Sequence, residues 1–279
     1  MNRSADMKSR GNTWLVISYG VLCIISVVMV FPFFYMFATA CKDDAQIVSK
    51  SVVPDVWHFR NFYTAWTKES FTRFMFNSLL VGVVTMCGAV WLASMAGYAF
   101  TRYRFRGAGV LFTIIVATMM VPGQVTMIPN FMISARLNLL DSYAGLVIPV
   151  LPLAFGTFMM RQFMRSVPES LIEAARIDGA SEYRIYLRIV LPLSKPALVT
   201  LGIFTFMSSW NNFMWPLIIL DTESKYTLPI GLLRFAQQYD VEYQYQMAVS
   251  LLSILPIMVL FFVFQRAFVQ GMALTGLKE

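Results

Sequence analysis

Residues 173–180 read Glu-Ala-Ala-Arg-Ile-Asp-Gly-Ala, and they combine two carboxylates, adjacent alanines and a glycine in an otherwise apolar chain. Adjacent alanines give a helix a narrow side that another protein can approach closely, and a carboxylate beside them can accept a charge-assisted hydrogen bond. This spacing indicates docking of a partner rather than bond making. The segment is therefore our first candidate site, as a surface through which something else moves this chain.

The sequence lacks the residues that catalysis or energy coupling would need. It has no Gly-Lys dipeptide and hence no phosphate-binding loop of the nucleotide-hydrolase type. Its single histidine, His58, excludes a two-histidine metalloprotease motif, and no Ser/His/Asp set converges. The three cysteines have neither metal nor redox spacing. We expect a chain that is not an enzyme, with no catalytic residue and no metal site of its own.

Six long apolar stretches indicate that membrane helices position this segment. Apolar residues make up 58% of the chain and charged residues 13%, against roughly 45–50% and about 25% in soluble domains. A helix needs ~20 residues to cross a bilayer. We predict an all-α integral membrane protein with six transmembrane helices, at residues 14–40, 76–100, 108–134, 143–160, 196–220 and 247–264. Pro122 and Gly123 interrupt the third of these spans.

Lys and Arg residues gather in alternate loops and give the orientation. We take residues 1–13 as a cytoplasmic N-terminal tail. The cytoplasmic segments then carry 14 of the 22 Lys and Arg residues: three in the tail, three in 102–106, six in 161–195 and two after residue 264. Because cytoplasmic loops are richer in these residues, both termini are predicted to be cytoplasmic and 165–195 is a cytoplasmic loop. The three arginines in 102–106 are read as an orientation anchor. This asymmetry explains the net charge of +7, so no nucleic-acid partner is expected.

None of the six predicted spans contains Asp, Glu, Lys, Arg or His. Carriers driven by protons or ions usually keep an ionisable residue at membrane depth. The sequence therefore argues against a secondary carrier, one of two alternatives from other functional classes. The second alternative, a membrane scaffold, would need no polar residues along a span. If transport is active, its energy must come from another polypeptide.

The 165–195 loop is predicted to hold two short helices. Ser166 as cap and Pro168 in the first turn start a helix that runs to about Ile177, and Gly179 lets the chain turn. Ser181 can cap the second helix. One face of the first helix would be formed by Leu171, Ala174, Ala175 and Asp178. The alternative is a solvated loop whose arginines merely satisfy the charge rule.

The run from Glu173 to Ala180, with Tyr186, Leu191-Pro192 and Pro196 downstream, resembles the coupling loop of binding-protein-dependent ABC importer permeases. Tyr186 stands where many members have Phe. Residues 139–146, 210–216 and 265–271 resemble the carbohydrate-uptake branch of that family. The chain as a whole is similar to the smaller, maltose-type permease subunit.

This resemblance implies a type I ABC importer permease fold over residues 14–279, in a multi-pass protein of the bacterial cytoplasmic (inner) membrane. The implied partners are a second homologous permease subunit, two ATPase subunits, an extracytoplasmic solute-binding protein and membrane lipid. No cofactor is expected on this chain, because ATP and Mg²⁺ would bind the ATPase subunits. The resemblance implies ATPase coupling through Glu173, Ala174, Ala175, Asp178, Gly179 and Ala180.

Uncharged polar residues at membrane depth suit a sugar, which offers hydroxyl groups and C–H faces. The predicted substrate path contains Gln124, Ser209, Trp210, Asn211 and Asn212. Hydrogen bonding between helices is an equally supported role for the two asparagines. Absence of charge favours an oligosaccharide, monosaccharide or polyol. Glycerol phosphate and acidic oligosaccharides stay open as alternatives.

A polar, tyrosine-rich loop precedes the last predicted span. Tyrosine offers a large contact area with a polar tip and is common at protein interfaces. In the resembling family this loop reaches the sugar-loaded binding protein, so Tyr239, Tyr243 and Tyr245 are the expected contacts with it. A structured lid or a hydrated loop is the alternative.

Overall fold

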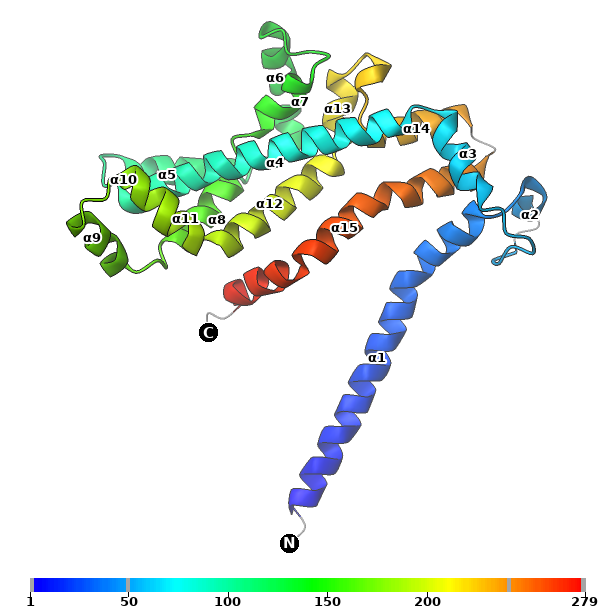
Figure 1. Ribbon diagram of the computed structural model, residues 1–279, viewed down its shortest axis with the longest axis horizontal. Coiled ribbons are helices and arrows are strands. Elements are labelled where there is room, and N and C mark those ends of the chain that lie inside the picture. Colours follow the sequence, from blue (N-terminus) through cyan, green and yellow to red (C-terminus); the bar gives the residue numbers. More distant parts are fainter. Residues whose placement is uncertain (1–2, 49–50, 240–241, 277–279) are drawn as a thin grey trace. The chain divides into compact units, whose positions relative to one another are not determined.

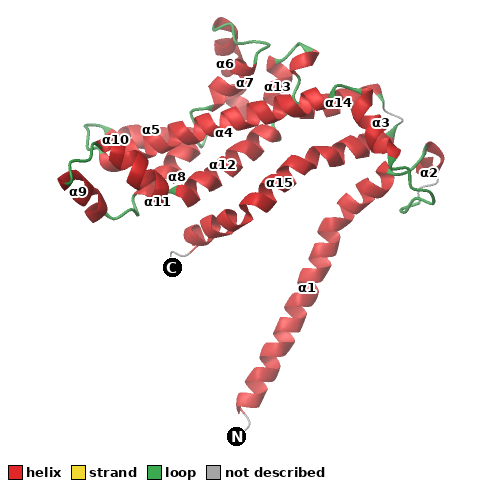
Figure 2. Ribbon diagram, viewed as in Figure 1, coloured by secondary structure: helices red, strands yellow, loops and turns green. Residues whose placement is uncertain are grey.

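The structure is a computed structural model that describes residues 3–48, 51–239 and 242–276, and every regular element in these ranges is a helix (Figure 1, Figure 2). The prediction of an all-α protein is confirmed. The chain divides into two compact units, one of residues 1–69 and 234–254 and one of residues 70–233 and 255–279.

The first unit contains α1 (Arg3–Ala40), α2 (Asp44–Val48) and α3 (Arg60–Lys68). Within α1, Ile17–Ala40 is long and apolar enough to cross a bilayer. The last carbonyls of a helix lack partners within it. Here Asn61 Nδ2 donates to the carbonyl oxygens of Ala40 (2.9 Å) and Lys42 (2.7 Å). The start of α3 therefore closes the end of α1.

Two helices pass from one unit into the other. They are α14 (Leu228–Gln238) and α15 (Tyr243–Gly276), and the stretch Tyr243–Gln265 of α15 also qualifies as a membrane span. Pro256 lies inside α15 and Pro32 inside α1. Proline is tolerated in membrane helices because neighbouring groups can satisfy the freed backbone.

The second unit is arranged around α4 (Phe71–Arg102), which packs against α8 (Ala154–Met164) and α12 (Lys195–Trp210) (Figure 1). Its buried side repeats small residues every four positions, at Thr85, Ala89, Ala93 and Gly97. Such a stripe lets helix backbones approach closely in membranes. A Cβ added at Gly97 would lie 2.7 Å from Met160 Cβ and 2.8 Å from the backbone nitrogen of Arg161. Glycine is therefore required at this crossing.

The remaining elements of the second unit are short, because breaks divide three apolar stretches. They are α5 (Ala108–Thr118), α6 (Gly123–Arg136), α7 (Tyr143–Val147), η1 (Ile148–Val150), α9 (Glu169–Ile177), α10 (Glu182–Ile185), the π-helical turn η2 (Tyr186–Val190), α11 (Leu191–Leu193), α13 (Met214–Ile219) and η3 (Glu223–Lys225).

Three bent helix pairs account for the shorter apolar stretches. The α5–α6 pair bends by 103° at the break around Pro122 that the sequence indicates, and the Tyr143–Val150 and Ala154–Met164 pair bends by 47°. The third pair, Glu182–Leu193 with Lys195–Trp210, bends by 77°. By length and composition the described chain has three spans, or up to six if each bent pair is one span. The count of six stays a prediction.

The hydrophobic core of the second unit continues from α4, α8 and α12 into the 165–195 segment. Ile172 of α9 and Ile185 of α10 are both fully buried, and they belong to the same cluster as Met160 and Leu201. A loop that was merely solvated would not bury such side chains. The segment is therefore packed as an extension of α4, α8 and α12.

Candidate functional site

The helix α9 carries the Glu-Ala-Ala motif and ends where the sequence predicts. Asp178 is its C-cap, and Gly179 follows with a φ of +77°. The Gly179 N–H donates to the carbonyl of Arg176 (3.0 Å), and the Ala180 N–H donates to that of Ala175 (2.9 Å). These two bonds form a Schellman motif, which needs the left-handed backbone that glycine adopts without strain.

The start of α9 differs from the prediction. The expected Ser166 cap is wrong, because the Ser166 hydroxyl donates backwards to the carbonyl of Phe163 (2.6 Å). Pro168 occupies the N-cap position and makes no side-chain cap. Proline at this place fixes the backbone entry to the helix, so no capping side chain is needed.

The predicted face of α9 is divided by the fold. Ala175 is buried beside Ile172, whereas Ala174 and Asp178 are exposed. Sequence reasoning missed Ile177, which is 86% exposed at the end of the helix. Ile172 and Ile177 are five residues apart and therefore lie on different sides of the helix. This spacing was a signal in the sequence that Ile177 points away from the core when Ile172 is buried. The outward surface of α9, which we call the docking face, comprises Leu171, Glu173, Ala174, Ile177 and Asp178.

A carboxylate outside the motif attaches α9 to α4. Glu182 Oε1 accepts a hydrogen bond from Arg176 Nε (2.7 Å), and its Oε2 accepts one from the Tyr98 hydroxyl (2.9 Å). The Tyr98 ring packs against that of Tyr186 at 5.1 Å, and the Tyr186 hydroxyl lies 2.7 Å from Ser94 Oγ. Both contacts join the 165–195 segment to a long membrane helix.

Ser181 explains why Glu182 occupies this position. The Ser181 side chain accepts a hydrogen bond from the Arg184 N–H (3.4 Å), which confirms the predicted cap. Glu182 then lies in the first turn of α10, where a negative charge is favourable. Sequence reasoning did not assign Glu182 a role. An acidic residue directly after a Ser cap was the available signal.

Arg102 has a structural role that Arg104 and Arg106 do not share, and the sequence alone did not distinguish the three arginines. Its side chain is only 5% exposed, and Nη2 donates to the carbonyl oxygens of Met164 (3.1 Å) and Val167 (3.0 Å). Nη1 lies 3.2 Å from Glu169 Oε2. Arg102 therefore closes the end of α8 and reaches the first residue of α9. Arg104 and Arg106 of the same basic cluster are exposed.

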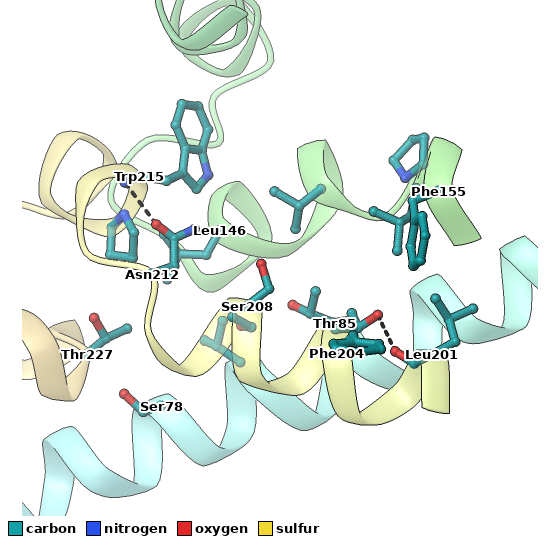
Figure 3. Close-up of a pocket in the computed structure, with 17 residues that line it drawn as sticks. Ser78, Thr85, Leu146, Phe155, Leu201, Phe204, Ser208, Asn212, Trp215 and Thr227 are labelled. Carbon is teal, nitrogen blue, oxygen red and sulfur yellow. Dashed lines mark hydrogen bonds between the residues drawn. The ribbon is translucent and has the colours of Figure 1, made fainter. Parts of the chain in front are cut away.

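A cavity of about 580 Å³ lies between α4, α12, α13 and the α7–η1 segment (Figure 3). Its volume is in the range of small-molecule sites. None of the described residues that line it is ionisable. Its polar lining consists of Ser78, Thr85, Thr205, Ser208, Ser209, Asn212 and Thr227. Its apolar lining includes Leu146, Phe155, Phe204 and Trp215.

The structure brings two of the five predicted path residues to this cavity. Ser209 and Asn212 line it, and Asn212 Oδ1 also accepts a hydrogen bond from the Trp215 N–H (3.3 Å). Trp210 is buried and stacks on Phe206 at 5.7 Å, outside the lining. Two residues are exposed and do not line the cavity, Asn211 at the end of α12 and Gln124 in α6.

The lining residues of α4 were missed by sequence reasoning. Ser78 and Thr85 are seven residues apart and therefore share one side of the helix. That spacing was a usable signal, but it does not tell which helices enclose that side. Thr227 lies outside the predicted spans, and its place in the cavity follows from the chain folding back before α14.

A polar cluster holds the segment that carries Thr227. Asp141 Oδ1 accepts hydrogen bonds from the backbone N–H groups of Asp221 (3.1 Å) and Thr222 (3.0 Å), and Oδ2 accepts one from Lys225 Nζ (2.6 Å). These bonds, that of Lys225 first, hold the pKa of Asp141 well below its usual value. From α4, Asn77 Nδ2 donates to the carbonyl oxygens of Ser224 (3.0 Å) and Tyr226 (2.9 Å).

The three predicted binding-protein contacts differ in their surroundings within the first unit. Lys68 Nζ lies 4.7 Å from the ring centre of Tyr239 and 4.4 Å from that of Tyr245, and it pairs with Glu242. Tyr243 is 48% exposed. Two of the tyrosines therefore enclose a cation of their own unit, while the third is open to a partner.

The sequence has relatives of known function over nearly its full length. Residues 89–274 match the family model described as binding-protein-dependent transport system inner membrane component. The chain is 34% identical to the arabinooligosaccharides transport system permease protein AraQ of Bacillus subtilis, covering 91% of this chain and 92% of AraQ. It is 33% identical to the sn-glycerol-3-phosphate transport system permease protein UgpE of Escherichia coli, covering 93% and 96%.

The fold is also similar to solved structures. One is a chain of a bacterial ABC transporter involved in the import of the acidic polysaccharide alginate, with a TM-score of 0.83 and 26% identity, covering 96% of this chain and 99% of that one. A chain of the alginate transporter in complex with its alginate pentasaccharide-bound periplasmic protein gives a TM-score of 0.60 at 16% identity, covering 94% and 97%. At that identity the likeness concerns the fold alone.

Proposed function

This chain belongs to the binding-protein-dependent transport system inner membrane components, and we propose that it is the sugar permease subunit of an importer that partner ATPases drive. Its relatives include an arabinooligosaccharide permease and a glycerol phosphate permease. The proposed fold is that of type I ABC importers, with six spans and both termini in the cytoplasm. The protein would reside in the bacterial inner membrane.

The observation that carries the coupling proposal is the attachment of α9. Its docking face is exposed, while Ile172 and Ala175 on the opposite side are buried in the core. Glu182 and Arg102 tie the same segment to the end of α4. A partner bound to the docking face would therefore move α9 together with the end of α4. Transmission of a conformational change by rigid-body motion is a common switching mode.

The residues that would meet the ATPase follow from exposure. Glu173 and Asp178 supply negative charge and Ala174 gives close access, while Gly179 and Ala180 keep the turn that ends the docking face. Ala175 would act from within, by fixing α9 to the core. A partly buried charged contact contributes about 1–3 kcal/mol. The partner ATPases would hold the ATP and Mg²⁺, and this chain would supply motion only.

A second permease subunit and the lipid bilayer would cover the apolar surface. The helix α5 has no buried residue within the described chain, and Val110, Leu111 and Ile114 are about half exposed or more. Exposed apolar surface of this extent marks a membrane or protein contact. An extracytoplasmic binding protein would deliver the sugar, with Tyr243 as the available contact of the three tyrosines.

The substrate class follows from the cavity. A glycerol phosphate or an acidic oligosaccharide would need fixed positive charge to offset its own, and the described lining supplies none. Neutral sugars or polyols need only hydroxyl partners and apolar faces. The cavity therefore favours a neutral substrate for this subunit.

The test is affinity purification of the chain from membranes, followed by ATPase and uptake assays with the loaded binding protein. We expect recovery of an ATPase and a second permease, with ATP hydrolysis stimulated by a neutral sugar. The Glu173→Lys variant should lose uptake while the binding protein still captures the sugar. Glu223→Lys, which changes an exposed charge in η3, is the matched control. Transport by the chain alone, without ATP, would overturn the proposal.

A further inference from the structure

We propose that the second unit binds an anionic phospholipid of the cytoplasmic leaflet where the end of α4, the start of α5 and the end of α8 meet (Figure 1). Arg104, Arg106 and Arg161 contact the headgroup, and α5 lies along the acyl chains. The inference goes beyond sugar import, because it gives this chain a lipid ligand. It rests on the orientation proposed above, in which this end faces the cytoplasm.

The first observation is positive charge that the surrounding helices do not balance. The helices α4, α5, α6 and α8 contain no Asp or Glu, and neither does the turn at residues 103–107. Glu169 of α9 pairs with the buried Arg102 (3.2 Å). Among the described residues, Arg104, Arg106 and Arg161 take part in no ion pair. Basic clusters beside a membrane helix on the cytoplasmic side attract anionic lipids.

The side chain of Arg161 is held with part of its guanidinium unused. Its Cζ lies 3.9 Å from the centre of the Phe112 ring, and its Nε donates to the carbonyl of Phe100 (3.3 Å). Its two terminal nitrogens have no hydrogen-bond partner among the described residues, and the side chain is partly exposed. A guanidinium stacked on a ring keeps its planar fork in place, and this fork matches phosphate oxygens.

The turn between α4 and α5 adds two arginines beside the same aromatic rings. Phe105 stands between Arg104 and Arg106, and its ring packs on that of Phe100 at 5.9 Å. Phe100 in turn packs on Phe112 at 5.6 Å. Both arginines of the turn are exposed. The fold therefore gathers three cations from distant parts of the sequence around one aromatic cluster.

The surface next to these cations is apolar, which favours a phospholipid over a protein partner. The helix α5 starts two residues after Arg106 and has no buried residue within the described chain. Val110 is 65% exposed and Ile114 is 55% exposed. A water-soluble ATPase could match the charge but not the exposed apolar helix. A phospholipid offers an anionic headgroup and apolar chains in one molecule.

The experiment measures which lipid lies beside α5 in the assembled transporter in nanodiscs. A fluorophore is attached to Val110→Cys, in a transporter from which the other cysteines, including Cys23, Cys41 and Cys87 of this chain, are removed. The nanodiscs contain phosphatidylcholine and phosphatidylglycerol in varied proportions. Bromine atoms on the acyl chains of one lipid or the other quench the fluorophore on contact. Comparison of the two quenching curves gives the preference of this position for the anionic lipid.

Three double variants test the arginines. Arg104→Gln with Arg106→Gln removes both charges, and Arg104→Lys with Arg106→Lys keeps them. The matched control is Arg184→Gln with Arg188→Gln, which removes two exposed charges from α10 and η2 on the same proposed side of the membrane.

We expect phosphatidylglycerol to be preferred about three- to tenfold over phosphatidylcholine at Val110, because each basic residue near the membrane surface attracts anionic lipid. The preference should be lost in the glutamine variant and retained in the lysine variant and in the control. Quenching by brominated phosphatidylcholine should persist in every variant, which shows that α5 still lies in lipid. The preference should also weaken at about 0.5 M salt, since salt screens exposed charges.

Equal quenching by the two brominated lipids in the unmodified transporter would overturn the anionic site. Absence of quenching by either lipid would also overturn it and would mean that a protein partner covers this end of α5. An equal loss of preference in the Arg184 and Arg188 control would show an effect of net charge rather than a site, and the proposal would then fail. The ATPase and uptake assays above are independent of these results, since an importer can work without a selective lipid.

Discussion

The hydroxyl of Tyr98, near the end of α4, donates a 2.9 Å hydrogen bond to the carboxylate of Glu182 at the start of α10. The same carboxylate holds Arg176 of α9 at 2.7 Å. One side chain thereby links the helix with the docking face to the longest helix of the second unit. We therefore expect motion of α9 to reach α4 through Glu182.

Tyr98→Phe should reduce coupling without preventing assembly. The variant loses one hydrogen bond to a charged group, about 1.5–3 kcal/mol at most, but keeps the ring that packs against Tyr186. We expect fewer sugar molecules imported per ATP hydrolysed in proteoliposomes. Tyr103→Phe, at a half-exposed tyrosine just beyond α4, is the control. Equal coupling ratios in both variants would contradict a role for the Tyr98 hydroxyl.

Gly179→Val should uncouple uptake from ATP hydrolysis, because φ at this position is +77°. A left-handed backbone costs an L-residue about 1–2 kcal/mol, and more for a β-branched one. No atom lies within 4 Å of an added Cβ, so crowding is not the cause. Gly179→Asn, which tolerates this backbone, should retain most uptake. Similar loss in both variants would point to a contact rather than to the turn.

Asp141→Asn should lower the thermal stability of the protein at neutral pH, and it should make that stability less sensitive to acid pH. The lowered pKa of Asp141 means that its stabilising bonds are complete above about pH 4, the unfolded value, and are lost as pH falls towards the folded one. As pH falls below about 4, the thermal midpoint of the unmodified protein should therefore fall more steeply than that of Asp141→Asn. Asn accepts the φ of 47° at this position.

The control for this experiment is Asp221→Asn, which changes an exposed carboxylate of the same polar segment. Its melting curve should follow that of the unmodified protein across the pH range. Parallel curves for Asp141→Asn and the unmodified protein would show that the Lys225 contact contributes no stability.

Gly97→Ala should destabilise the second unit by about 1–3 kcal/mol, as overpacking does. The added methyl would lie within 2.8 Å of the Arg161 backbone nitrogen, and backbone cannot move aside as a side chain can. Gly20→Ala is the matched control in α1, where nothing lies within 4 Å. Thermal unfolding in nanodiscs measures both. A Gly97→Ala protein as stable as the control would contradict the close crossing of α4 and α8.

Tyr243→Ala should weaken capture of the loaded binding protein, whereas Tyr239→Ala should mainly lower thermal stability. Tyr243 is about half exposed, while Tyr239 packs on Lys68 and Phe235. Surface plasmon resonance and thermal unfolding separate the two effects. The prediction fails if Tyr239→Ala alone loses binding at unchanged stability.

The helical nature of the 165–195 segment was predictable because its signals are local. Gly179 ends α9 and Ser181 caps α10 through hydrogen bonds between residues at most five positions apart. The Ser166 cap failed for an equally local reason, since the serine hydroxyl bonds the preceding turn. The burial of Ala175 could not be read from the motif, because it depends on α4 and α8.

The cavity was only partly predictable. Ser209 to Asn212 are consecutive, and a helix turns once in about 3.6 residues, so they cannot all face one cavity. Thr85 escaped notice because a threonine in an apolar stretch resembles any other until the neighbouring helices are placed, and Thr227 because it lies outside the predicted spans. For the same reason Arg102 was indistinguishable in sequence from Arg104 and Arg106.

The uncharged lining of the cavity has an electrical consequence. Each elementary charge that crosses a membrane field contributes about 2.3 kcal/mol per 100 mV. A neutral sugar in this cavity would carry none, and the described lining would move none with it. If the substrate is the neutral sugar proposed above, we expect its passage to be electroneutral, and the rate of uptake should be unchanged when the membrane potential is collapsed at constant ATP.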